Sequence, residues 1–229
     1  MTYPRNAHFA LSEIYIKGLL SNAKKQHRIE IKPRHGGKII GQGKCRTQAI
    51  EKIEPKGFMA TQLSAHSFTN PCPFIIGETI LIKEKWTYTF GVHNGKKGIF
   101  LKYISDGELR FFPESSFPEN WTPPKFTKNT TTINAVKMPK NFVRLCIEIT
   151  NIRMERLLEI TDEDALKEGI EPIHKGDRII YPNYSNNDIE TSEYSPSESL
   201  ISLWQKLKGV KTTYKNPFVW VIEFDNKEI

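Results

Sequence analysis

Positively charged side chains gather in one segment near the start of this 229-residue sequence. From Lys17 to Lys56 there are eleven lysines and arginines against three acidic residues, a local surplus larger than the +7 of the whole chain. Ammonium and guanidinium groups bind phosphate and carbonyl oxygens, so a segment this basic suits a polyanion such as nucleic acid. A solvated basic surface is the alternative interpretation. The charge changes sign over 155–198, where twelve acidic residues meet four basic ones.

The elements expected to position this segment are a helix and a strand. Apolar residues recur every three or four positions in 11–23, which predicts an amphipathic helix leading directly into the basic segment. Residues 26–31 alternate and are followed by Pro33, which predicts a short strand. The glycine-rich 34–66 is interpreted as an insertion near a site, and the Asn/Ser/Glu-rich 182–198 as a second, mobile insertion.

The rest of the sequence is rich in predicted strands. Asn94-Gly95 between two alternating segments predicts a β-hairpin, and Thr161 with Asp164 resembles a helix cap. Short strands separated by turns, with two or three helices, predict an α+β or β-barrel architecture in one domain over 1–229. The predicted strands are 78–85, 86–92, 98–104, 109–112, 142–150 and 218–224, and the later helices are 162–168 and 199–208.

Several motifs of cofactor and metal sites are missing from the sequence. Gly37 to Lys44 resembles a phosphate loop, but it lacks the first glycine of that motif and continues into Cys45 instead of Ser or Thr. The six histidines lack metal-ligand spacing, so no metal and no cofactor are expected. The three cysteines lie far apart, and no secretory leader or membrane-length apolar run is seen, which favours a reducing cytoplasm.

Several segments, taken in order, resemble the phage and prophage branch of the ASCH family, a group of PUA-like β-barrels. That branch carries a helix followed by Gly-Arg-Lys-Thr-Gln-Thr-Arg-Arg-Val-x-Lys-Pro, and in this chain Lys24, Gln26, Arg28, Lys32 and Pro33 fall on the pattern. The resemblance covers roughly 11–33, 74–107 and 133–224. Its further matches are Ile76-Gly77 to Trp86, Tyr103 to Gly107, Met138-Pro139, Arg144, Ile147 to Leu157, Asp164 to Ile170, Leu203-Trp204 and Asn216 to Phe224.

The resemblance implies an α+β fold built on a PUA-like (ASCH) β-barrel with flanking helices. It also implies binding of RNA, or of a ligand that contains a nucleobase, in a basic cleft beside residues 24–32. Cationic side chains would contact phosphates, and Trp86, Tyr103 or Trp121 would stack on a base. Core packing is the preferred interpretation for Trp204 and Trp220. The residues expected to bind nucleic acid are Lys24, Arg28, Lys32, Trp86, Tyr103 and Arg144.

One enzymatic branch of the family resembles metal-independent amidohydrolases that remove an acyl group from the N4 amine of cytidine. Its Lys, Thr and Glu correspond to Lys24, His27 and Glu168, so the chain departs from the pattern at His27. An imidazole can activate water, but it cannot supply the hydroxyl of threonine. Glu168 paired structurally with Lys24 is the alternative. A third hypothesis is a phage accessory protein that binds a host protein or a signalling nucleotide. The expected partners are thus RNA, another single-stranded nucleic acid or a modified nucleoside.

Overall fold

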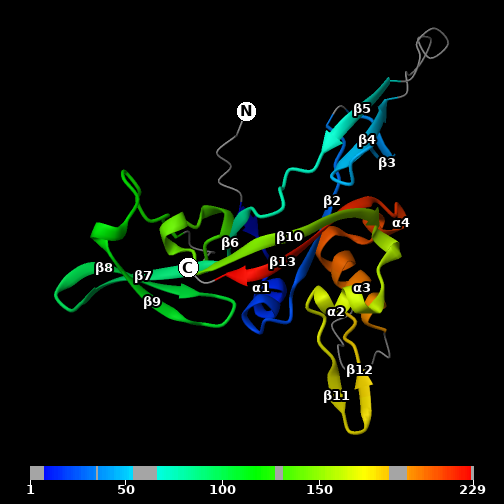
Figure 1. Cartoon of the computed structure of the whole chain (residues 1–229). Coiled ribbons are helices and arrows are strands. Elements are labelled where there is room, and N and C mark those ends of the chain that lie inside the picture. The colour runs from blue at the N-terminus through cyan, green and yellow to red at the C-terminus, as the bar shows by residue number, and fades with distance from the viewer. Residues whose placement is uncertain (1–7, 35, 54–65, 127–130, 186–194, 228–229) are drawn as a thin grey trace. The chain divides into compact units, whose positions relative to one another are not determined.

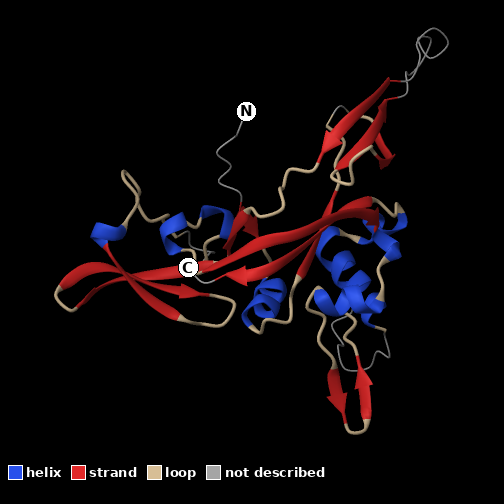
Figure 2. Cartoon of the chain, in the orientation of Figure 1, coloured by secondary structure: helices blue, strands red, loops and turns tan. Residues whose placement is uncertain are grey.

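The computed structural model describes residues 8–34, 36–53, 66–126, 131–185 and 195–227 (Figure 1). The fold is mixed α+β and consists mostly of strands (Figure 2). The chain divides into two compact units. The first unit holds residues 8–22, 79–148 and 225–227, and the second holds 23–78 and 149–224. None of the helices in the described ranges is long and apolar enough to cross a membrane.

The first unit contains two groups of strands and one α-helix. Strand β1 (His8–Ala10) pairs in parallel with β6 (Thr79–Lys83), which pairs antiparallel with the start of β10 (Leu145–Arg156). The second group is an antiparallel sheet with the order β7-β8-β9. Its members and the helices of this unit are β7 (Trp86–His93), β8 (Lys96–Tyr103), β9 (Leu109–Pro113), α1 (Glu13–Leu20), and the 3₁₀ helices Glu114–Ser116, Ala135–Lys137 and Lys140–Phe142.

The turn and the alternation of the β7–β8 hairpin both follow from its sequence. Asn94 and Gly95 have φ angles of 49° and 75°, the left-handed region that a tight hairpin turn requires. In the half of the hairpin away from the turn, alternate residues of the two strands lie on one face and are buried there, whereas Phe90 and Val92 nearer the turn are exposed. That face forms the core of the first unit together with a later segment: Trp86, Tyr88, Ile99, Leu101, Tyr103, Ile133, Met138, Phe142 and Val143.

The second unit contains a sheet with the order β10-β13-β2. Strand β13 (Phe218–Lys227) runs antiparallel to β2 (Gln26–Glu30), with Trp220 opposite Ile29. Residues 219–222 of β13 are all buried, which indicates that both faces of this part of the strand are covered. The other elements are β3 (Lys38–Gln42), β4 (Gln48–Ile53), β5 (His66–Pro71), β11 (Ile173–Lys175), β12 (Arg178–Ile180), α2 (Asp162–Lys167), α3 (Pro196–Lys208), α4 (Val210–Tyr214) and the 3₁₀ helix Leu157–Glu159.

Two helices of the second unit, α2 and α3, begin at residues whose side chains cap them. Ser195 accepts a hydrogen bond from the Glu198 backbone N–H, and the Glu198 carboxylate accepts from the Ser195 backbone, which is a complete capping box. Thr161 caps α2 in the same way, by accepting from the Asp164 N–H at 3.1 Å. Helix α3 buries Leu200, Leu203 and Trp204. Trp204 and Trp220 are each 2% exposed, so the prediction that they pack in the core is confirmed.

The two predicted insertions are more regular than the sequence indicated. Within 34–66, strands β3 and β4 pair antiparallel, and β4 pairs with β5, while residues 54–65 lie outside the described residues. The glycine-rich start of this segment is ordered around a buried carboxylate, because Glu51 accepts backbone hydrogen bonds from Arg34 and Gly37. Within 182–198, residues 196–198 are the first turn of α3, and 186–194 lie outside the described residues.

Candidate functional site

Lys24 lies in the interior of the second unit and not in an open cleft. It follows α1 and forms a β-bridge with Glu168, at the end of α2, and its side chain is fully buried. The Lys24 ammonium donates to Glu168 Oε2 at 2.8 Å, to the Glu168 carbonyl at 3.0 Å and to the Gln26 carbonyl at 2.6 Å. An ammonium group has three donors, so these bonds use all of them. The expected role of Lys24 as a phosphate contact is therefore not supported.

Arg28, two residues further along β2 than Gln26, is enclosed in the same way. Its guanidinium donates to Glu155 Oε1 at 2.5 Å, to Asp164 Oδ2 at 3.1 Å and to Glu168 Oε1 at 3.0 Å, and its side chain is 1% exposed. Arg153 on β10 completes the group through Asp164 at 2.7 Å and Glu155 at 3.1 Å, and it also pairs with Glu223. We call Lys24, Arg28, Arg153, Glu155, Asp164, Glu168 and Glu223 the ion-pair cluster.

The ion-pair cluster joins the basic and the acidic segments of the sequence. Two of its three cations, Lys24 and Arg28, come from the basic segment, and three of its carboxylates, Glu155, Asp164 and Glu168, come from the acidic one. Buried ion pairs lose their hydration and must satisfy each other with close hydrogen bonds, as they do here. Part of the positive surplus seen in the sequence is therefore neutralised inside the second unit and is absent from its surface.

The three residues expected from the amidohydrolase pattern do come together. Glu168 Oε2 lies 2.8 Å from Lys24 Nζ and 3.8 Å from His27 Nδ1. The His27 side chain is 12% exposed, whereas the side chains of Lys24 and Glu168 are 0% and 1% exposed, so only His27 reaches the surface. A reacting group could approach this triad only through the imidazole.

The protonation of the triad follows from burial and charge. Burial alone would raise the pKa of Glu168, but the positive charge of Lys24, the contact with His27 and Arg28 together hold that pKa well below its usual range. Burial lowers the pKa of Lys24 against the opposing effect of Glu168. Burial, aided by Lys24 and Lys208, also lowers the pKa of His27, so His27 is neutral at neutral pH. A neutral imidazole can accept a proton, whereas so acidic a carboxylate is a poor general base.

A hollow of about 470 Å³ lies at the end of β2 in the second unit. We call it the β2 hollow. Three of its lining residues are cationic, namely Lys32, Arg34 and Lys208, and one, Glu30, is acidic. Within the described residues, neither Lys32 nor Lys208 forms an ion pair, and both are exposed. The remaining lining residues are Ile29, Ile31, Pro33, Asn70, Pro73 and Trp220.

The β2 hollow contains one of the predicted binding residues and several that the sequence did not indicate. Lys32 was expected there from its place in the basic segment. Lys208 is the last residue of α3 and was missed, because nothing local distinguishes it from the other lysines of that helix. Asn70 comes from β5, and its side chain donates to the Lys32 carbonyl at 3.0 Å. Lys208 also lies near enough to His27 to lower the pKa of the imidazole.

Trp86, Tyr103 and Arg144 in the first unit do not form the binding surface that was expected of them. Trp86 and Tyr103 are 0% exposed, so neither ring can stack on a ligand base. Arg144 is buried, with its guanidinium 4.0 Å from the centroid of the Tyr103 ring. That guanidinium donates to Glu84 at 2.8 and 2.9 Å and to Asp106 at 2.7 and 3.0 Å. These three residues are structural, and of the tryptophans considered for stacking only Trp121 remains half-buried.

A scan of the chain against models of known protein families finds no match. Searches of curated proteins and of solved structures find none either. The resemblance to the ASCH family therefore stays a prediction, and the function has to be argued from the site itself. Within the described part of the chain, no group of three or more His, Cys, Asp or Glu side chains is placed to hold a metal ion.

Proposed function

We propose that this protein binds single-stranded nucleic acid, and RNA in particular, at the β2 hollow. The observation that carries the proposal is the placement of Lys32, Arg34 and Lys208 around one concave surface that has a single opposing carboxylate, Glu30. Cations placed this way can each meet a phosphate oxygen of an extended strand. Apolar lining residues such as Pro33 and Pro73 can contact sugars and base faces.

The ion-pair cluster has a supporting part in this proposal. Lys24 and Arg28 hold β2 to α2 and β10 through Glu168, Glu155 and Asp164, so the strand that carries the hollow is fixed before a ligand arrives. A preorganised site loses less conformational entropy on binding. In this proposal the phosphate contacts of the basic cleft are Lys32, Arg34 and Lys208, and no longer Lys24 and Arg28.

The preference for RNA and the cytoplasmic setting are parts of the proposal that rest on sequence. The PUA-like (ASCH) resemblance over residues 11–33, which include Lys32, favours RNA or a nucleobase ligand. The spacing of the three cysteines favours a reducing compartment. Both expectations are compatible with a surface that recognises phosphates.

The test is a salt titration of binding, using fluorescence anisotropy of a labelled twelve-nucleotide oligo-uridine. For single strands, each phosphate that a protein neutralises contributes about −0.7 to the slope of log affinity against log salt. We expect the variant carrying Lys32→Ala and Lys208→Ala to bind more weakly and to show a slope shallower by about 1.4. Lys206→Ala is the matched control, because Lys206 is an exposed lysine of the same helix that does not line the hollow.

Two outcomes would contradict nucleic-acid binding at the β2 hollow. One is wild-type binding that does not weaken as salt rises, because phosphate contacts always release counterions. The other is a Lys208→Ala variant with the same affinity and the same slope as Lys206→Ala. A labelled oligo-deoxyuridine of the same length shows whether RNA is preferred, since the two strands differ chiefly in the 2′-hydroxyl.

A second candidate function, hydrolysis of an N-acylated nucleoside, is favoured by the convergence of Lys24, His27 and Glu168. Here the neutral His27 imidazole would take a proton from the attacking water, and the amide would be split into a carboxylic acid and an amine. The buried side chains of Lys24 and Glu168 would support the imidazole on the side that faces the protein interior. The structure supports this candidate less well, because only an edge of His27 is accessible.

The hydrolase candidate is tested by incubating the protein with N4-acetyl- and longer N4-acylcytidines and following the released cytidine by chromatography. His27→Asn is the informative variant, because the amide has similar size but cannot act as a base at neutral pH. Turnover by the wild type that His27→Asn abolishes, with unchanged circular dichroism, would support the candidate. No turnover across the panel, or equal turnover by His27→Asn, would exclude it.

A further inference from the structure

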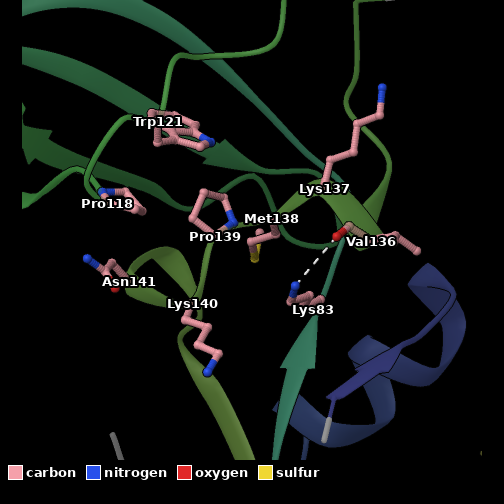
Figure 3. A pocket seen from close by; sticks show the side chains of 9 residues that line it. All are labelled: Lys83, Pro118, Trp121, Val136, Lys137, Met138, Pro139, Lys140 and Asn141. Carbon is pink, nitrogen blue, oxygen red and sulfur yellow. Dashed lines mark hydrogen bonds between the residues drawn. The ribbon is translucent and has the colours of Figure 1, made fainter. Parts of the chain in front are cut away.

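A second hollow, of about 400 Å³, lies within the first unit (Figure 3). We call it the Trp121 hollow. Its walls come from the end of β6, from Pro118 and Trp121, and from the segment 136–141, which includes parts of two 3₁₀ helices. Met138 is 1% exposed and belongs to the core of this unit, so one side of the hollow is rigid. The lining residues are Lys83, Pro118, Trp121, Val136, Lys137, Met138, Pro139, Lys140 and Asn141.

Every charged residue that lines the Trp121 hollow is a lysine. Lys83, Lys137 and Lys140 extend from its walls, and no carboxylate is among the lining residues (Figure 3). Lys83 is half-buried and donates to the Val136 carbonyl at 3.5 Å, which is a long and weak hydrogen bond. Burial and the nearby positive charge of Lys140 both lower the pKa of Lys83. The positive charge of Lys140 is thus felt at Lys83, and an anion that contacts both lysines would be attracted by both charges.

Trp121 presents a fixed aromatic surface beside these cations. Its ring packs edge-to-face against Phe117 and Phe142, each with a centroid distance of 5.1 Å. The core therefore holds the indole on one side, while its half-buried remainder lines the hollow. An immobilised indole is a favourable stacking surface for a flat heteroaromatic ring, because little side-chain entropy is lost when the ring binds.

We propose that the Trp121 hollow binds a nucleoside monophosphate, with the base against Trp121 and the phosphate between Lys83 and Lys140. The hollow is in the size range of small-molecule sites, and it combines an apolar wall with a few cationic groups. The lysines alone would suit any anion, but the indole beside them selects an anion that carries an aromatic ring. This site is separate from the β2 hollow, because none of its lining residues belongs to the second unit.

Tryptophan fluorescence gives a direct test on the full chain. Of the four tryptophans, Trp86, Trp204 and Trp220 are at most 2% exposed, so a base added from solution can stack only on Trp121. We expect adenosine monophosphate to quench the emission saturably, and adenosine or inorganic phosphate to bind much more weakly. Lys140→Met, which keeps the apolar part of the side chain, should weaken binding of the nucleotide by about tenfold.

Two controls separate this site from a general charge effect and from the β2 hollow. Lys97→Met removes an exposed lysine of the same unit that does not line the hollow, and it should leave the affinity for the nucleotide unchanged. The variant with Lys208→Ala should also bind adenosine monophosphate normally, whether or not it binds oligonucleotides.

A further variant tests the indole itself. Trp121→Phe keeps the ring contacts with Phe117 and Phe142, and calorimetry should find that its affinity for the nucleotide is lower by about fivefold or more, because a smaller ring stacks less well.

Three results would overturn the proposal. The first is emission that does not change saturably with adenosine monophosphate. The second is a Lys140→Met variant that binds the nucleotide as well as Lys97→Met does. The third is inorganic phosphate that competes as strongly as the nucleotide, because the indole would then contribute nothing to recognition.

Discussion

Removing the negative charge of Glu168 tests the ion-pair cluster most directly. Glu168→Gln keeps the shape of the side chain but removes the carboxylate that Lys24 contacts at 2.8 Å, and the two other bonds of Lys24 described above are made to backbone carbonyls. Breaking a buried ion pair on one side costs about 3–5 kcal/mol. We expect a loss near the lower end, about 3 kcal/mol, because Arg28 keeps Glu155 and Asp164 as partners.

The assay is urea unfolding followed by circular dichroism, with the free energy of unfolding compared between Glu168→Gln and the wild type at pH 7. A matched control is Glu163→Gln, which removes a carboxylate from the same helix. Glu163 pairs with Lys167 in solvent, with side chains 77% and 47% exposed. Because exposed pairs contribute little, the stability of this control should stay within the error of the measurement.

The same variant has a defined dependence on pH. The pKa of Glu168 in the folded protein lies below its value of 4.5 in the unfolded chain. Its stabilising contribution is therefore present above pH 4.5 and is lost as the pH falls towards the pKa of the folded state. The stability difference between the wild type and Glu168→Gln should narrow progressively below pH 4.5. A loss under about 1 kcal/mol at pH 7, or a difference that does not narrow in acid, would refute the described pairing of Glu168.

Three further predictions concern stability. Arg144→Gln should cost about 3 kcal/mol or more in urea unfolding, because it leaves the buried Glu84 without its main cation; a loss as small as that of Arg110→Gln, whose ion pair is exposed, would contradict this. Ser195→Ala should cost about 1 kcal/mol by removing the cap of α3, whereas Ser195→Asp should restore most of that stability. Gly95→Ala should cost about 1 kcal/mol, because φ is +75° there, and thermal unfolding that matches the wild type would argue against the described turn.

Local sequence signals predicted several elements of this fold, but not β1, β3, β5, β11, β12 or α4. Asn94-Gly95 located the β7–β8 hairpin because few other dipeptides accept two consecutive left-handed residues. Thr161 with Asp164 located the start of α2, since a threonine oxygen satisfies a backbone donor that the helix leaves unpaired. Helix α3 begins three residues earlier than predicted, because the capping box of Ser195 and Glu198 was not recognised there.

Long-range pairing is what the sequence could not supply. Lys24 and Arg28 fit a phosphate-binding pattern, but their charges meet Glu168 and Glu155, more than a hundred residues away. A surplus of charge in one segment does not tell whether another segment neutralises it. The burial of Tyr103 could have been predicted, because it lies two residues after Leu101 and four after Ile99 along β8 and so shares the face of these apolar residues.

The strands β3 and β4 within 34–66 were not predicted, because the glycines there obscured the pattern of a strand. Gly37 instead allows close approach of two strands, since a side chain placed there would lie 2.4 Å from the Lys52 carbonyl oxygen. Strand β4 has Ala49 and Glu51 buried on one face. The strand was hard to recognise in the sequence, because a charged residue at a buried position breaks the expected alternation of apolar and polar residues.

The division of this chain into units has a consequence for how it is completed during synthesis. Each unit is made of separate stretches of sequence. Residues 225–227, the end of β13, belong to the first unit, although they follow the last residue of the second unit in the chain. Neither unit corresponds to one continuous stretch of sequence, so a single cut in the chain cannot separate one complete unit from the other. A chain that ends anywhere before Asp225 therefore lacks part of the first unit, even when the second unit, which ends at Phe224, is complete.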